Sequence, residues 1–249
     1  MREFHGLYAL WYREIKVFLR EKSRILSSIV NPLLWMIAFG FGLGPSVSLN
    51  EIDYHKFIFP GILTMTVLFS SIFFGLYIVW DKKLDFFKEV IVAPLSRITL
   101  FLGKMLGGCT QVLLQVTFLI IFGIFIGLEY NWHSLLITII ILFFLAMAAT
   151  SLGLSIGSQM NSFEGFGLIQ SFIVMPLFFF SGALYPLENL PNWFFDIVRI
   201  NPLSYVVDGI RGALFGLNHC LIIIDILITL IFTLITIIIG IVSFMRMRL

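Results

Sequence analysis

Side chains able to do acid–base, nucleophilic or metal chemistry are few in this sequence, and they are scattered along it. The histidines fall at the N-terminus or in loops, at His5, His55, His133 and His219. The two cysteines, Cys109 and Cys220, belong to different apolar segments, and there is no His-Glu-x-x-His pattern or Cys/His cluster. We therefore expect no catalytic residue and no metal ligand set.

A phosphate-binding loop is also absent from the sequence. Its one Gly-Lys pair, Gly103-Lys104, is followed by Met105 where such a loop needs Ser or Thr, and the upstream glycine is missing. The chain is therefore not expected to be an enzyme, nor to bind ATP or another cofactor by itself.

The composition points to a membrane protein. Hydrophobic residues make up 59% of the 249 residues and charged residues only 12%, and the mean hydropathy is +1.03. Too few polar side chains remain to cover a soluble globule, so we predict an integral membrane protein whose solvent is the lipid bilayer. The formal net charge of +2 is small and gives no reason to expect a nucleic-acid partner.

Six apolar segments have about the length that a spanning helix needs. They are residues 25–44, 58–80, 105–127, 134–158, 166–184 and 221–244. Because backbone groups in lipid must be satisfied within the segment, and the alternation of barrel strands is missing, the predicted fold class is an all-α integral membrane protein with six transmembrane helices. No internal repeat or linker divides it, so residues 1–249 are expected to form a single domain.

The N-terminal residues 4–22 have helical periodicity, with apolar side chains on one side and basic ones on the other. This pattern predicts an amphipathic helix lying in the membrane interface, although a solvated basic tail has the same pattern. The residues expected at the interface are Trp11, Tyr12, Arg13, Phe18 and Arg20.

The distribution of basic residues predicts the orientation. If the N-terminus is cytoplasmic, 13 of the 16 lysines and arginines lie on the inside, and only Lys56, Arg199 and Arg211 lie outside. The positive-inside rule then places both termini in the cytoplasm. The segment 81–104 becomes a cytoplasmic loop, and residues 185–216 lie on the outer side.

The outer segment breaks into two short amphipathic pieces, 190–199 and 202–215, each too short to span a bilayer. We expect them to form a re-entrant or surface helix pair, in which Asn201-Pro202 caps the second helix and Asp208 pairs with Arg211 at i and i+3. The candidate residues of this outer gate are Pro186, Glu188, Pro191, Trp193, Asn201, Pro202, Tyr205, Asp208 and Arg211. Pro176 lies inside the fifth predicted span, 166–184, and is expected to kink that helix.

The cytoplasmic loop 81–104 can form a short amphipathic helix that Pro94 ends. Such a helix suits a groove on a partner protein, but a basic loop bound to anionic lipid is an equal alternative. Its candidate contact residues are Lys82, Lys83, Phe86, Phe87, Lys88, Glu89, Val90, Ala93, Pro94 and Arg97.

Polar side chains inside the predicted spans are the remaining candidates for function, because they are unfavourable in lipid. They are Gln111, Gln115, Ser151, Ser155 and Gln170. They could line a translocation pathway, or join helices by hydrogen bonds.

Three blocks of the sequence resemble the ABC-2 family of ATP-binding-cassette exporter permeases, in particular its daunorubicin-resistance-like branch. The first runs Pro-Leu-Phe-Phe-x-Ser-Gly-Ala-Leu-x-Pro-Leu-Glu-Asn-Leu-Pro-x-Trp from Pro176, and the second Asn-Pro-Leu-Ser-Tyr-x-Val-Asp-x-x-Arg from Asn201. The third is Lys-Glu-Val-Ile-Val-Ala-Pro-Leu-Ser-Arg, from Lys88 to Arg97 in the cytoplasmic loop; Asp85 stands where relatives often carry glycine.

The resemblance implies a permease subunit in a prokaryotic plasma membrane that exports a hydrophobic or amphipathic drug or lipid-like substrate. It also implies an ATP-binding-cassette ATPase subunit as partner, which holds ATP and Mg and grips the loop 81–104 as a coupling helix, and a second permease copy, usually as a homodimer. A permease for lipid-linked polysaccharide or teichoic-acid-type export has the same features. An ion-gradient-driven transporter or channel is the alternative from another class.

Overall fold

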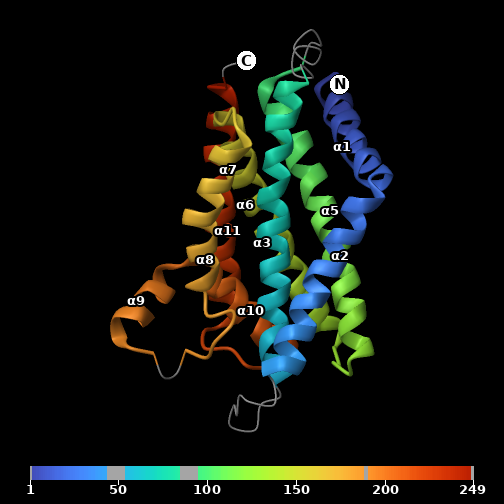
Figure 1. The fold of residues 1–249 in the computed structure, drawn as a ribbon. Coiled ribbons are helices and arrows are strands. Elements are labelled where there is room, and N and C mark those ends of the chain that lie inside the picture. The colour runs from blue at the N-terminus through green and yellow to red at the C-terminus, as the bar shows by residue number, and fades with distance from the viewer. Residues whose placement is uncertain (1, 44–53, 85–94, 188–189, 248–249) are drawn as a thin grey trace.

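The computed structural model describes residues 2–43, 54–84, 95–187 and 190–247, and every regular element in these ranges is helical. Figure 1 shows a bundle of long helices with shorter ones at one end. The elements are α1 (Arg2–Arg20), α2 (Lys22–Ile37), the π-helical segment η1 (Ala38–Leu43), α3 (Tyr54–Lys83), α5 (Arg97–Phe125), α6 (Trp132–Gln159), α7 (Phe163–Ile169), the π-helical segment η3 (Gln170–Val174), α8 (Met175–Phe179), α9 (Asn192–Ile200), α10 (Pro202–Phe215) and α11 (Ile222–Met245).

Among the described residues, five helical stretches are long and apolar enough to cross a membrane, and each overlaps a predicted span. They are Lys22–Gly40, Tyr54–Lys83, Arg97–Phe125, Trp132–Gln159 and Ile222–Met245. The fifth predicted span, 166–184, corresponds to a shorter apolar run, Phe163–Phe179. The all-α class is therefore confirmed, with five full-length apolar helices.

The short run is interrupted where Pro176 enters it. The π-helical segment η3 lies directly before α8, and Pro176 occupies the first turn of α8. Proline has no N–H to donate to the preceding turn, and its ring crowds the carbonyl four residues earlier, so the backbone there widens. The run ends early because Gly182 adopts a φ of 71°, a conformation that does not continue a helix.

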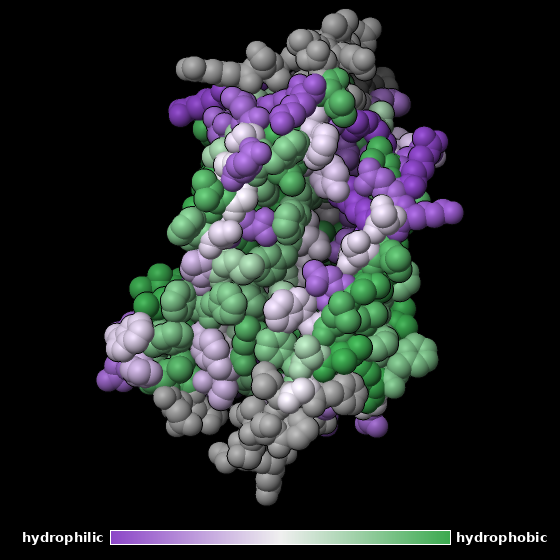
Figure 2. Space-filling view, viewed as in Figure 1, coloured by the Kyte–Doolittle hydropathy of each residue, from purple (hydrophilic) through white to green (hydrophobic). Residues whose placement is uncertain are grey.

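The two ends of the bundle differ in what they carry. The chain termini lie at the same end as the C-terminal end of α3 and the N-terminal end of α5, while α9 and α10 lie at the other end (Figure 1). On the face shown in Figure 2, hydrophilic residues gather at the end with the termini and hydrophobic residues cover the middle of the bundle. This is the distribution expected of a protein surrounded by lipid.

The centre of the bundle is the contact between α3 and α6, where glycines let the backbones touch. A Cβ atom built on Gly75 would lie 2.0 Å from the carbonyl oxygen of Gly153, and one on Gly157 would lie 2.1 Å from the carbonyl oxygen of Gly75. Small residues spaced by four are a common means of close packing between membrane helices. The Gly153/Gly157 spacing therefore serves packing within the chain.

Candidate functional site

A buried cluster of charges lies at the base of the loop between α3 and α5. Lys104 of α5 is 1% exposed, and its Nζ lies 2.5 Å from Oδ2 of Asp81 in α3 and 3.1 Å from Oε1 of Glu14 in α1. Glu14 is 4% and Asp81 9% exposed. The two residues that bound the loop, Asp81 and Lys104, are thus bonded to each other and to the N-terminal helix.

Arg13 completes the cluster at its more exposed edge. Its guanidinium lies 2.7 Å from Oε1 of Glu14 and 3.6 Å from Oδ1 of Asp81. Two cations therefore face two carboxylates. A buried charge is tolerated when it is paired and hydrogen-bonded in this way, and removing one partner leaves the others uncompensated.

The N-terminal helix α1 is fastened to α5 along most of its length. Gly103 and Gly107 of α5 leave room for it, since a Cβ on Gly107 would lie 2.6 Å from the Cβ of Glu14. Trp11 donates from Nε1 to Oγ1 of Thr110, at 3.0 Å, and Gln111 donates from Nε2 to the carbonyl of Glu14, at 3.2 Å. Packing and hydrogen bonds therefore join α1 to α5 at several points along α1.

The structure divides the residues predicted for the interfacial helix. Tyr12 is 44% exposed and Arg20 is also exposed, as an interfacial face requires. Phe18 is buried, with the guanidinium of Arg24 above its ring at 5.6 Å. Trp11, predicted for the headgroup zone, is instead hydrogen-bonded to α5. The amphipathic helix is confirmed, and one of its faces is used for packing within the protein.

The basic residues next to the loop are bonded to helix ends in the bundle. The Nζ of Lys82 donates to the carbonyls of Ser158 and Met160 at the C-terminal end of α6. Arg97 donates to the carbonyl of Met245, at 2.7 Å, at the end of α11. These unpaired carbonyls carry the negative end of the helix dipole, so cations stabilise them. Lys82 and Arg97, predicted as contacts to a partner, are therefore held within the chain.

The remaining loop residues are placed as follows. Lys83 is exposed, and its ammonium lies 4.1 Å from the centre of the Phe163 ring. The other predicted loop contacts lie outside the described residues: Phe86, Phe87, Lys88, Glu89, Val90, Ala93 and Pro94. The described ends of the loop are thus fixed by ion pairs and hydrogen bonds to α1, α6 and α11.

A groove of 620 Å³ opens between α2, α3 and the α7–η3–α8 run. Its wall is mostly aromatic and aliphatic, with a few polar side chains at intervals. The polar members are Ser27, Ser28, Asn31, Thr66, Ser70 and Gln170. A largely apolar groove with a few polar groups suits a hydrophobic or amphipathic molecule.

A second cavity of 280 Å³ continues this groove toward the charged cluster, because both are lined by Ser27, Ser28 and Ser70. Its wall adds Gln111 and Gln115 of α5. Gln111 accepts a hydrogen bond from Arg24, at 2.8 Å. Three of the polar residues predicted in the spans therefore line the two adjoining cavities: Gln170 the first, and Gln111 and Gln115 the second.

Ser151 and Ser155 of α6 do not line either of these cavities. Ser151 is fully buried, and the carbonyl of Ser155 accepts a hydrogen bond from Ser243 of α11, at 3.1 Å. The hydroxyl of Ser151 has no hydrogen-bond partner among the described residues, and the bond at Ser155 uses its backbone carbonyl, so these two side chains do not support the helix-joining alternative.

The two short helices predicted within residues 185–216 are present as α9 and α10. The side chain of Asn201 accepts from the N–H of Leu203, at 3.0 Å, and Pro202 occupies the first helical position, which confirms the predicted cap. Asn201 also donates to the carbonyl of Leu177 in α8, at 2.6 Å. Trp193 is 63% exposed on α9, and Tyr205 donates to the carbonyl of Arg199.

The expected pair between Asp208 and Arg211 is wrong. Arg211 is buried and donates to the carbonyls of Phe57 and Gly182, each at 3.3 Å. Asp208 instead accepts from backbone N–H groups beyond α10. Spacing by three brings the two residues to the same side of the helix. Both side chains nevertheless bond to backbone carbonyls or N–H groups of other segments, because buried backbone groups need hydrogen-bond partners.

The remaining residues predicted for the outer gate are two prolines and a glutamate. Pro186 lies between α8 and α9 and is half-buried, and Pro191 is the residue before α9, where it fixes the backbone at the helix start. Glu188 lies outside the described residues.

Replacing Asn201 should separate its two roles. Asn201→Asp keeps the oxygen that caps α10 but loses the donor to Leu177, whereas Asn201→Ala loses both. We expect the alanine variant to lower the free energy of unfolding by about 2 kcal/mol, roughly 1 kcal/mol from the cap and the rest from the unpaired buried carbonyl. Thermal unfolding in detergent would measure this, with Asn192→Ala, on exposed α9, as the control; equal melting temperatures for all variants would contradict it.

The charged cluster was not predicted from the sequence, although the position of one of its residues could have indicated it. Glu14 lies in the apolar stripe of α1, four residues after Leu10 and four before Phe18, both of which are buried. A carboxylate in such a stripe needs a buried cation. Asp81 carried no comparable signal, because it stands at the edge of an apolar span beside Lys82 and Lys83, and Lys104 stood at the predicted start of a span, where a lysine is common.

Comparison with known proteins agrees with this architecture. Residues 5–215 match the family described as ABC-2 type transporter. The chain is 31% identical over 204 residues to the transport permease ycf38 of Cyanophora paradoxa, covering 79% of this chain and 70% of the relative. It is 25% identical over 221 residues to the inner membrane transport permease YadH of Escherichia coli K12, covering 86% and 84%.

A further relative is nodulation protein J of Rhizobium leguminosarum bv. viciae, 24% identical over 220 residues, which cover 86% of this chain and 85% of that protein. Permeases of this family normally work with an ATPase subunit. The matched region contains α1, the charged cluster, the groove and the outer helices. The chain belongs to the ABC-2 type transporter family of membrane permeases.

Proposed function

We propose that this chain is the membrane-spanning subunit of an ABC exporter that moves a hydrophobic or amphipathic, drug-like or lipid-like molecule outward. A separate subunit binds ATP and Mg and supplies the energy. The observation that carries the proposal is the ion cluster of Glu14, Asp81 and Lys104, which joins both ends of the loop 81–104 to α1. When an ATPase subunit binds this loop, movement of the loop would be transmitted to α1 through the ion cluster.

The proposed topology has six crossings in one domain, with both termini cytoplasmic in a prokaryotic plasma membrane. The position of the two termini at one end, beside the ends of α3 and α5, supports an even number of crossings (Figure 1). The excess of basic residues at that end supports the orientation. The fifth crossing is the run Phe163–Phe179, whose 17 residues are near the lower limit for spanning.

The groove between α2, α3 and the α7–η3–α8 run is the proposed substrate route. It lies open on one side of the chain, and apolar residues such as Trp35 and Phe179 on its wall are 38% and 50% exposed. A second copy of the permease placed against this side would close it into a pathway. The helices α9 and α10 would then act as the gate on the exit side. The hydrogen bond from Asn201, at the start of α10, to α8 would link this gate to the wall of the groove.

Substitution in the loop tests the coupling part of the proposal. In a complex with its ATPase subunit, we expect Phe87→Ala to reduce transport at least about tenfold while ATP hydrolysis continues, because a hydrophobic anchor between two proteins carries about 2 kcal/mol or more. Substitution of Pro94, which ends the predicted helix, should uncouple in the same way. ATPase activity and ATP-dependent substrate flux would be measured in the same proteoliposomes.

The matched control is Phe125→Ala, since Phe125 is 82% exposed at the far end of α5. It should transport as the wild type does. Transport by Phe87→Ala at the wild-type rate would contradict the assignment of the loop as the coupling element.

A further inference from the structure

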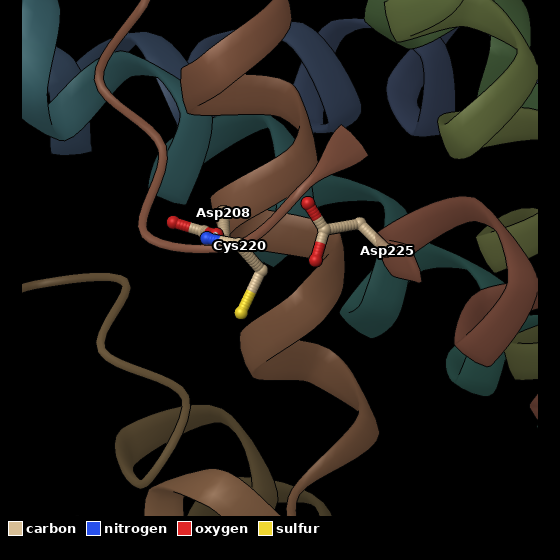
Figure 3. Close-up of side chains that lie close together, drawn as sticks. All are labelled: Asp208, Cys220 and Asp225. Atoms are coloured by element: carbon tan, nitrogen blue, oxygen red, sulfur yellow. The ribbon is translucent and has the colours of Figure 1, made fainter. Parts of the chain in front are cut away.

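Three side chains with metal-binding atoms converge where α10 meets α11. They are Asp208 of α10, Cys220 of the connecting segment and Asp225 in the first turn of α11, and one ligand atom of each lies within 4.8 Å of the others. Figure 3 shows the two carboxyl groups and the thiol grouped at this junction, each from a different element. The cluster is at the end of the bundle opposite the loop and is separate from the groove.

Asp225 is the unexplained member of this group. Its side chain is 0% exposed, and neither carboxylate oxygen has a hydrogen-bond partner. Gly209 packs directly on it, since a Cβ at Gly209 would lie 3.0 Å from the Cβ of Asp225. An ionised carboxylate enclosed in this way, beside a second carboxylate, is strongly unfavourable unless it takes up a proton or a cation pairs with it.

Asp208 is held in position for such a charge. Its Oδ1 accepts from the N–H of His219, at 2.9 Å, and its Oδ2 accepts from the N–H of Cys220, at 2.8 Å. These bonds fix the carboxylate and the start of the segment that carries Cys220. Oδ2 also accepts from the N–H of His219, at 3.0 Å, whereas Oδ1 has one donor among the described residues and keeps a second lone pair for an ion.

We propose that Asp208, Cys220 and Asp225 bind a divalent transition-metal ion, with Zn²⁺ as the best fit. Zn²⁺ accepts mixed carboxylate and thiolate ligands and prefers four-coordinate, tetrahedral geometry, with bonds of about 2.0–2.3 Å and hence ligand atoms about 3.5 Å apart. The ligand atoms lie within 4.8 Å of one another in the structure, so binding of the ion would draw them closer together. Water, or the exposed His219 imidazole on the same cavity wall, completes the coordination.

The ion has a route to this place. Asp208, His219 and Cys220 line a cavity of 670 Å³ between α9, α10 and the start of α11. An ion bound there would join α10 to α11 by bonds to both helices, and so would stabilise this end of the bundle in proportion to its affinity and concentration. The spacing 208, 220, 225 matches no short metal motif, which is why the sequence did not predict the site.

Cobalt spectroscopy on the purified full chain tests the site directly. The protein, prepared in detergent without a polyhistidine tag and stripped with a chelator, would be titrated with Co²⁺ and then with competing Zn²⁺. We expect a thiolate-to-cobalt charge-transfer band that saturates at one equivalent and that Zn²⁺ abolishes. No such band with the folded wild-type protein would overturn the proposal.

Variants assign the band to these residues. Cys220→Ser should abolish it, whereas the matched control Cys109→Ser, whose buried thiol lies near Thr150 in α5, should keep it. Asp225→Asn should weaken Co²⁺ binding tenfold or more, because even outer-shell changes at metal sites cost about 10–100-fold. An unchanged band in Cys220→Ser, or a Zn²⁺-induced rise in melting temperature that is equal in wild type and Asp225→Asn, would overturn the proposal. If Cys220→Ser does not fold, Asp225→Asn provides the same comparison.

Discussion

Replacing Lys104 by methionine should lower the free energy of unfolding by about 3–5 kcal/mol, the cost of removing one partner from a buried ion pair. Lys104 is 1% exposed, and its loss leaves the carboxylates of Glu14 and Asp81 facing each other, with Arg13 as the cation that remains among the described residues. Chemical or thermal unfolding in detergent would measure the change. The same variant should also reduce coupling, since α1 and the loop base lose their shared bond.

Two comparisons make the Lys104 result specific. Lys56→Met, at an exposed position near the start of α3, removes the same charge and should change stability by less than about 0.5 kcal/mol. The triple variant Glu14→Gln, Asp81→Asn, Lys104→Met removes the charges together and should recover most of the loss. Equal stability of Lys104→Met and Lys56→Met would show that the cluster does not hold the loop base.

Replacing Gly75 by alanine should lower the stability by about 3 kcal/mol, near the top of the range for overpacking. The new methyl group would lie 2.0 Å from the carbonyl oxygen and 2.1 Å from the carbonyl carbon of Gly153. Both are backbone atoms, so no side chain can move aside, and α3 and α6 must separate. The groove wall contributed by α3 would shift as well, so substrate transport should fall with stability.

Gly167→Ala in α7 is the control for Gly75→Ala. A Cβ there meets nothing within 4 Å, and the residue is helical, so the variant should be neutral or gain up to about 1 kcal/mol from helix propensity. Melting temperatures of the two variants would be compared in the same detergent. A Gly75→Ala protein as stable as Gly167→Ala would contradict the close backbone contact between α3 and α6.

Much of the helix content could be predicted because membrane helices are defined by their length, by their hydrophobicity, and by the capping residues and prolines that begin or interrupt them. The cap at Asn201-Pro202 and the interruption at Pro176 follow from local backbone chemistry, and both are present. The fifth predicted span started three residues late, because Ser162 caps the helix before the apolar run begins, and it ended five residues late, because Gly182 turns the chain.

The candidate sites were less predictable, because they join residues from distant parts of the chain. The charged cluster joins residues of three helices, Glu14, Asp81 and Lys104, and the sequence around each residue does not indicate which other residues it contacts. Lys82 and Arg97 were expected to face a partner because they are basic and flank a loop. Their use at the ends of α6 and α11 depends on which helix termini lie beside them, which the sequence alone does not give.

These contacts suggest how the two ends of the protein communicate. Force on the loop would reach α1 and α5 through the charged cluster, and α6 and α11 through Lys82 and Arg97. The groove lies along α3 and α2, and the end away from the loop reaches Phe178 and Leu184 near the bond between Asn201 and α8. In the proposed coupling, a change at the loop end alters the width of the groove and the position of α9 and α10.

The central claim is that ATP hydrolysis by a partner subunit drives transport through this chain. The most direct measurement is substrate flux in proteoliposomes that contain the chain with or without an ATP-binding-cassette subunit that co-purifies with it. We predict outward flux only when both the subunit and hydrolysable ATP are present, and its loss in Lys104→Met. Flux driven by an imposed ion gradient, with the chain alone and no nucleotide, would contradict the account.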